Sequence, residues 1–143
     1  MLRIVLTVCL LLSGCGLIPP EPIDFRAYPL EHVPPAEAVD LVRDVAHDIF
    51  TARFGGGFDM SWDAAQQNLT VGPVEEGQRR LTLHLVLTPK GEGTLLEMLA
   101  LVESMGRADT GMIAWGRPKQ DVYFEEKFYE AILEEQLDRA DAP

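Results

Sequence analysis

The strongest constraint on the fold is a run of alternating leucines in the middle of the chain. Leucine occupies every second position from residue 81 to residue 87, and the residues between the leucines are mostly polar. Because successive side chains of a β-strand point to opposite faces of the sheet, this pattern predicts a strand with one apolar face. A sheet that contains such a strand buries that face under a second layer of structure.

Further short runs with strand character lie on both sides of the leucines, separated by turns rich in glycine. They predict an antiparallel meander of four to five strands. Residues 94–104 are ambiguous, because Thr94 and Glu97 could also cap a helix there, but the short spacing of the turns favours a strand. Gly72-Pro73 is expected to close the preceding strand. The expected strands cover residues 58–62, 69–71, 81–87, 94–104 and 112–115, with turns at 75–77 and 89–93.

Two segments show the three- and four-residue spacing of apolar residues that is typical of an amphipathic helix. The first begins near Pro35, a residue suited to the first helical turn, and ends before the glycines at 55–57. The second runs from about Asp121 to Asp138 and has a broad apolar face. The order helix, meander, helix predicts a single α+β domain at 35–140, with both helices on one face of the sheet.

The first fifteen residues form a separate unit. A single cation, Arg3, precedes an apolar run from Ile4, and small residues then lead to a cysteine in the sequence Leu12-Ser13-Gly14-Cys15. This pattern resembles the signal peptide and lipobox of bacterial lipoproteins. A membrane-spanning helix needs about 20 apolar residues, which is roughly twice the length of this run.

The resemblance implies a protein that is anchored by lipid. Residues 1–14 would be removed as the signal peptide, and Cys15 would carry a diacylglyceryl thioether and a further acyl chain such as palmitate. An aspartate after the cysteine would resemble an inner-membrane retention signal, but Gly16 stands there. We therefore expect the protein at the outer membrane, on its periplasmic side.

Residues 15–34 connect the expected anchor to the domain. Prolines at positions 19, 20, 22, 29 and 34 favour an extended tether. The stretch Ile23–Val33 is nevertheless too apolar for a plain flexible linker. Two alternatives remain open, because this stretch could hang free or lie against the domain.

Composition argues against several functions. Removal of residues 1–14 takes away one of the 12 basic residues and none of the 23 acidic ones. Such an acidic chain is a poor partner for nucleic acid and for anionic lipid. Cys15 is the last cysteine, so thiol catalysis is not expected, and Asp40, Asp44 and His47 share a helix face without a predictable third strong metal ligand. We expect no catalytic residue, no metal and no cofactor.

Two surface features indicate contact with a partner. Trp115, Arg117 and Lys119 form a basic and aromatic segment in an otherwise acidic chain. The second face of the sheet cannot be purely polar, because Val86 and apolar residues of the range 95–102 share it. We therefore expect a non-enzymatic envelope lipoprotein, an accessory or scaffold subunit that contacts another envelope protein. The alternative is a small domain that holds an apolar or anionic ligand between helix and sheet.

Overall fold

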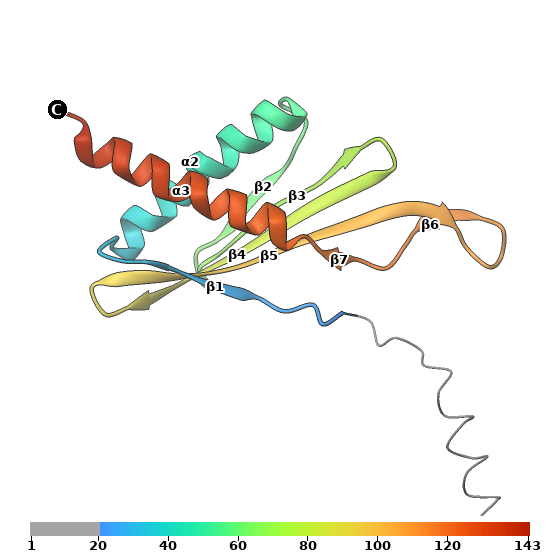
Figure 1. Cartoon of the computed structure of the whole chain (residues 1–143), viewed down its shortest axis with the longest axis horizontal. Helices are drawn as coiled ribbons and strands as arrows, with labels where there is room; N and C mark the ends of the chain where they lie inside the picture. Colours follow the sequence, from blue (N-terminus) through green and yellow to red (C-terminus); the bar gives the residue numbers. More distant parts are fainter. Residues whose placement is uncertain (1–20) are drawn as a thin grey trace, which may run out of the picture.

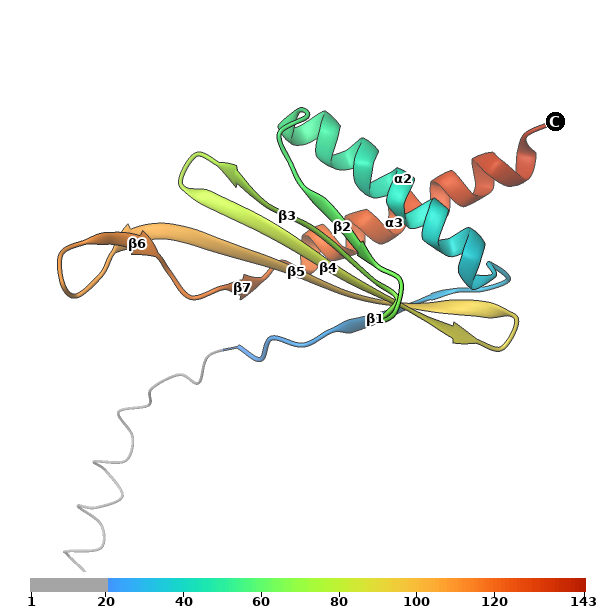
Figure 2. The ribbon, with the colours of Figure 1, turned by 180° about the vertical axis from the view of Figure 1, so that it is seen from behind.

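The computed structural model describes residues 21–143, so the expected signal peptide and Cys15 lie outside the described residues. The chain forms an α+β fold in which an antiparallel sheet of seven strands carries two long helices on one face (Figures 1 and 2). The predicted fold class is confirmed, whereas the strand count exceeds the predicted four to five. The elements are β1 (Arg26–Leu30), α2 (Pro35–Phe54), β2 (Met60–Asp63), β3 (Asn68–Glu76), β4 (Arg79–Lys90), β5 (Gly93–Arg107), β6 (Ile113–Trp115), β7 (Lys119–Gln120) and α3 (Val122–Asp141).

Strand β5 organises the sheet. Strands β2 to β5 form the predicted meander, so the ambiguous segment 94–104 is a strand and not a helix. Strand β4 pairs with β5 over its full length, from Arg79 opposite Ser104 to Lys90 opposite Gly93. The strand predicted at 112–115 is β6, and the additional strands β1 and β7 are short segments that share the other edge of β5 with it. Along that edge, β1, β7 and β6 pair in turn with residues 94–98, 101–102 and 105–107.

The strand that was expected to close at Gly72-Pro73 does not end there. Strand β3 continues to residue 76, and its pairing with β4 shifts register across this dipeptide. Proline cannot donate a hydrogen bond to the ladder, but a bulge accommodates it without ending the strand. Gly72 has a φ of +93°, and a Cβ there would lie 2.6 Å from the carbonyl oxygen of Leu81. The turns expected at 75–77 and 89–93 are also shorter, because residues 75–76, 89–90 and 93 belong to strands.

The alternating leucines of β4 lie between the sheet and the helices, as the sequence predicts. Their exposed fractions lie between 0% and 5%. The helices meet over this face through aromatic side chains, with 6.0 Å between the ring centres of Phe50 and Phe124. Gly55 ends α2 with a φ of +72°, and the Asp121 carboxylate accepts a hydrogen bond from the Phe124 amide at the start of α3.

Residues 23–33 were expected either to hang free or to lie against the domain, and the structure shows that they lie against it. Residues 26–30 form the edge strand β1, and Tyr28, Leu30 and Val33 are buried. The expected tether at 15–34 and the domain start at 35 therefore need correction, because the sheet already begins at Arg26. Apolar side chains at alternate positions of this segment are removed from water only when it joins the sheet.

Strand β1 reaches β5 through a close approach of two backbones. A Cβ at Gly93 would lie 2.5 Å from the carbonyl oxygen of Leu30 and 3.1 Å from the amide nitrogen of His32. Beside it, the Thr94 hydroxyl donates a hydrogen bond of 2.8 Å to the carbonyl oxygen of Val33. Glycine at position 93 therefore leaves room for the turn that follows β1.

Replacing Gly93 by alanine should destabilise the protein by about 1–3 kcal/mol, the usual range for overpacking a close contact. Gly106→Ala is the matched control in the same strand, because a Cβ at Gly106 would meet nothing within 4 Å. Urea unfolding of both variants measures the difference. Equal free energies of unfolding would show that β1 does not approach β5 as described.

Candidate functional site

The sheet face opposite the helices carries no covering layer among residues 21–143 (Figures 1 and 2). We call it the uncovered face. Because side chains alternate along each strand, the residues between the buried leucines of β4 point to this side. The pairing register places residues of β3 and β5 beside them. The uncovered face includes Thr70, Arg80, Thr82, His84, Val86, Leu95, Glu97, Leu99, Leu101, Glu103 and Trp115.

An apolar row runs along β5 on the uncovered face. It consists of Leu95, Leu99 and Leu101, is interrupted by Glu97 and ends at Glu103. Leu99 is 8% exposed, and Leu95 and Leu101 are partly exposed. Apolar area that no layer covers is typical of a surface that contacts a partner. The expectation that the second face is not purely polar is therefore confirmed.

His84 lies in the middle of the uncovered face without a catalytic setting. Its Nδ1 is 3.4 Å from the hydroxyl oxygen of Thr70, and the residue pairs with Leu99 across the ladder. Partial burial lowers the pKa of His84, because desolvation disfavours the charged imidazolium. The imidazole is thus neutral at neutral pH and forms part of a mixed apolar and polar surface.

A hairpin projects from one end of the sheet (Figure 1). It comprises the end of β5, a turn and β6, and we call residues 105–115 the arm. Two side chains near its tip are unusually open to solvent, since Met112 is 70% exposed and Ile113 is 68% exposed. Arg107 pairs with Ile113 in the ladder, so a cation accompanies this apolar tip.

Three side chains fix the base of the arm. The Arg80 guanidinium donates hydrogen bonds of 2.5 and 2.9 Å to the two carboxylate oxygens of Glu103. The same guanidinium lies 4.6 Å from the ring centre of Trp115. The hydrogen bond from Arg80 lowers the pKa of Glu103, which keeps the carboxylate charged. These contacts tie β6 to β4, two strands that do not pair with each other.

The three residues expected to form a contact surface lie in different local structures at this end of the sheet. Trp115 stacks with the arginine at the base of the arm. Arg117 is exposed in the loop between β6 and β7. Lys119 lines a hollow of about 410 Å³ together with Arg79 and Ser104. The tryptophan thus belongs to the uncovered face, whereas the two cations belong to the edge of the sheet.

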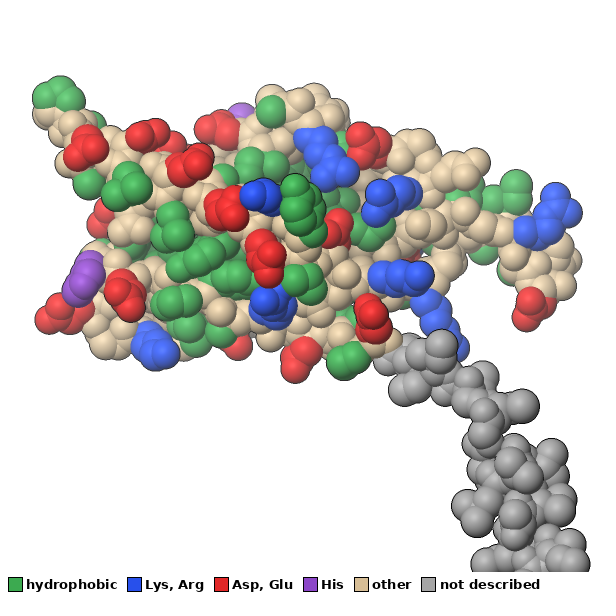
Figure 3. All heavy atoms as spheres, in the orientation of Figure 1, with side chains coloured by type: hydrophobic (Ala, Val, Ile, Leu, Met, Phe, Trp, Pro, Cys, Tyr) green, Lys and Arg blue, Asp and Glu red, His purple; other side chains and the backbone are tan. Residues whose placement is uncertain are grey.

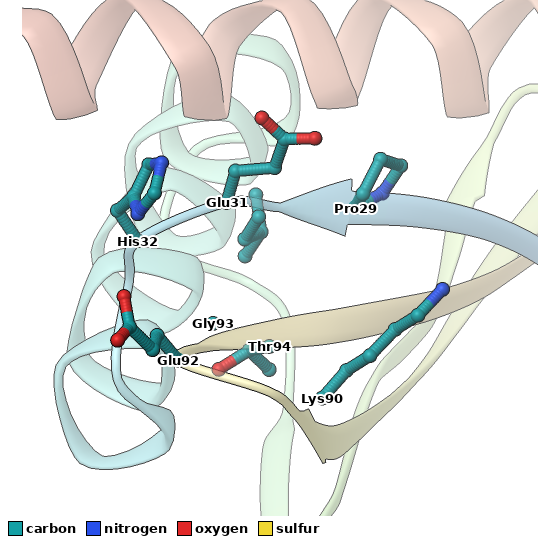
Figure 4. Close-up of a pocket in the computed structure, with 8 residues that line it drawn as sticks. Pro29, Glu31, His32, Lys90, Glu92, Gly93 and Thr94 are labelled. Carbon is teal, nitrogen blue, oxygen red and sulfur yellow. The ribbon is translucent and has the colours of Figure 1, made fainter.

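A second hollow, of about 450 Å³, lies at the opposite end of the sheet, between the loop after β1 and the turn before β5 (Figure 4). Its charged side chains do not converge on one point. Figure 4 shows Glu31 directed toward α3 and Lys90 directed along the sheet, away from His32 and Glu92. Among residues 21–143, no three His, Cys, Asp or Glu side chains are arranged to hold a metal ion. The hollow therefore gives no support to a catalytic centre.

The helix-face residues Asp40, Asp44 and His47 lie on the exposed side of α2. Asp44 accepts a hydrogen bond of 2.6 Å from Arg139, which connects α2 to the end of α3. The Nδ1 of His47 lies 3.5 Å from Asp48. Ion pairs this exposed to solvent contribute little to stability, so these residues form a solvated helix face.

A buried carboxylate that sequence reasoning missed joins the sheet to α3. Glu125 is 0% exposed, and its Oε1 accepts hydrogen bonds of 2.9 Å from the Ala100 amide and 2.8 Å from Gln120. The Tyr28 hydroxyl donates to Oε2 at 3.3 Å. Ala100 lies between the parts of β5 that pair with β1 and with β7. The carboxylate thus supplies the acceptor that a neighbouring strand would otherwise provide.

Burial raises the pKa of Tyr28 from its ordinary 10.0 to about 12, and the charge of Glu125 beside it acts in the same direction. A raised pKa means that the folded state favours the neutral phenol. Tyr28 therefore contributes stability that is fully present below pH 10.0 and is lost as the pH rises through about 12.

Replacing Glu125 by alanine should lower the free energy of unfolding by at least about 1–3 kcal/mol, because the Ala100 amide would be buried without a partner. Glu126→Ala is the matched control. Its carboxylate is exposed, pairs with Arg26 at 3.4 Å and should contribute no more than about 1 kcal/mol. Thermal unfolding of the two variants decides the matter. A loss no larger than that of the control would show that Glu125 does not complete the edge of β5.

Neither helix in the described part of the chain has the length and apolarity that crossing a bilayer requires. No protein-family model matches the sequence, and no curated protein matches it either. The surfaces described above, namely the uncovered face and the arm, are therefore the basis for inferring what the protein does.

Proposed function

We propose that this protein is a non-enzymatic lipoprotein of the bacterial envelope. Cys15 anchors it to the outer membrane on the periplasmic side, and its domain acts as an accessory or scaffold subunit that contacts another envelope protein. The observation that carries the proposal is the apolar row on the uncovered face. It leaves Leu95 and Leu101 partly exposed, whereas the leucines of β4 on the helix side are at most 5% exposed.

The composition of the uncovered face suits a protein partner. Leu95, Leu99 and Leu101 supply apolar contact area, while Thr82 and His84 beside them supply hydrogen-bonding groups. Interfaces that form between separately folded proteins combine an apolar centre with polar groups in this way. An open sheet face also offers a broad contact area, whereas small molecules bind in concave pockets.

The alternative function, a ligand held between helix and sheet, receives less support. Phe50, Leu83, Phe128 and Ile132 fill the space between the two layers with exposed fractions of 0–1%. Among the described residues, every buried side-chain nitrogen and oxygen already has a hydrogen-bond partner. A ligand in this space would have to displace packed side chains, which makes the outer surfaces the better candidates.

Replacing Cys15 by serine should abolish lipid attachment and leave the precursor unprocessed, because a serine hydroxyl cannot form the thioether. Metabolic labelling with a palmitate analogue measures this directly. Ser13→Ala is the control, since it keeps a small residue before the cysteine. Label retained in the Cys15→Ser variant would contradict the anchor.

The partner should co-purify with the protein at a fixed stoichiometry when envelopes are dissolved in mild detergent. Leu101→Glu, which places a charge in the apolar row, should release the partner while leaving the melting temperature nearly unchanged. Leu137→Glu is the matched control, because Leu137 is 66% exposed on α3. Equal release by both variants would contradict a contact on the uncovered face. A co-purifying small molecule instead of a protein would favour the alternative function.

A further inference from the structure

We propose that the arm and the sheet edge beside it rest on the anionic phospholipid surface that holds the anchor, so that the protein touches the bilayer at a second place. This inference rests on the proposed lipidation of Cys15. It concerns a different surface from the apolar row that we assign to a protein partner. Exposed apolar side chains, local charge and the reach of the chain support it independently.

Exposed apolar side chains gather at one end of the molecule. Eight large apolar side chains are exposed among residues 21–143, and all except Leu137 belong to three segments. These segments are the first described residues, the arm and the start of α3, and they adjoin β7 (Figure 1). We call this region the anchor end. Its exposed apolar side chains are Ile23, Phe25, Met105, Met112, Ile113, Val122 and Tyr123.

Basic side chains accompany this apolar group. Arg107, Arg117 and Lys119 are exposed, and within residues 106–120 the only acidic side chain is Asp109. None of the ion pairs within the described residues involves these three cations. Figure 3 shows Lys and Arg side chains near the start of the described chain and toward the arm.

The net charge of the whole chain argues against binding to anionic lipid. The attraction between one surface and a bilayer nevertheless depends on the charges near that surface. Exposed charges are screened over about 8 Å at physiological ionic strength, so acidic groups at the far end of the domain hardly act on the arm. Cations close to an anionic bilayer are attracted to it, and apolar side chains beside them enter the boundary between headgroups and acyl chains. The anchor end combines both features.

The chain leaves the domain at the same place. The amide of Asp24 donates a hydrogen bond of 3.2 Å to the Gln120 side chain, which in turn donates one of 2.9 Å to the Asp24 carbonyl oxygen. Only eight residues lie between Cys15 and Asp24, and the nine steps from one Cα to the other span at most about 30 Å even when the chain is fully extended. A lipid on Cys15 would thus keep Asp24, and β7 beside it, within this distance of the bilayer.

The test uses the mature lipidated protein in vesicles of phosphatidylcholine with phosphatidylglycerol. Met112→Cys is labelled with an environment-sensitive fluorophore, and lipids with a quencher in the acyl chain report contact. The introduced cysteine is the only free thiol, because Cys9 leaves with the signal peptide and Cys15 is acylated. Leu137→Cys is the matched control, since Leu137 is similarly exposed at the opposite end of the domain.

We expect strong lipid quenching at position 112 and none at position 137. Arg117→Glu should lower the equilibrium constant for contact at least about fivefold, given roughly 1 kcal/mol per cation near an anionic surface. Arg43→Glu, on the exposed side of α2, should leave the quenching unchanged. Vesicles of phosphatidylcholine alone should give weaker quenching than the anionic vesicles.

Two results would overturn the inference. In the first, the protein floats with the vesicles but position 112 is quenched no more than position 137. In the second, the probe at position 112 is shielded from water without lipid quenching, which would mean that another protein covers the arm. Failure of the anchor looks different, because the protein would then not float with the vesicles at all.

Discussion

The pairing of β5 on both edges is the constraint on which the rest of the fold depends. Its 15 residues hold β4 along one edge and three short strands along the other. The short strands leave Ala100 without a strand partner for its amide, and Glu125 fills that place from α3. The Glu125 carboxylate therefore stabilises the position of α3 and the edge of β5 together, because it is part of α3 and accepts a hydrogen bond from β5. Its burial is tolerable only because amide, hydroxyl and backbone donors surround it.

The same strand separates the surfaces that the protein can use. Side chains on one side of β5 meet the helices, and those on the other side remain uncovered as the apolar row. Beyond the end of β4, β5 continues into the arm, where both sides meet solvent. The proposed protein contact and the proposed lipid contact thus lie on successive parts of one strand. The stacked layer of Arg80, Glu103 and Trp115 marks the boundary between them.

The sequence predicts the layers of this fold better than its edges. Strand β4 and helices α2 and α3 each bury one face against another layer. The apolar residues of that face recur at fixed spacing in the sequence, so these elements can be predicted from the local pattern. Strand β1 was harder to predict, because the prolines around it are compatible both with an extended tether and with an edge strand. Glu125 sits beside Phe124 on the apolar face of α3, and an acidic residue in that position was a signal of a buried partner. The partner itself, an amide of β5, could not be inferred, because it depends on where β1 and β7 stop pairing.

The position of β1 also determines how the domain bears a load. Residues 21–25 continue in line with β1 (Figures 1 and 2). Hydrogen bonds of an antiparallel ladder run perpendicular to the strands, so a pull along the strand axis stretches all of them at once. The five residue pairs from Arg26 opposite Met98 to Leu30 opposite Thr94 would share the force, instead of opening one after another. Strand β1 would therefore resist, in shear, a pull on the chain that precedes it, although it has only five residues.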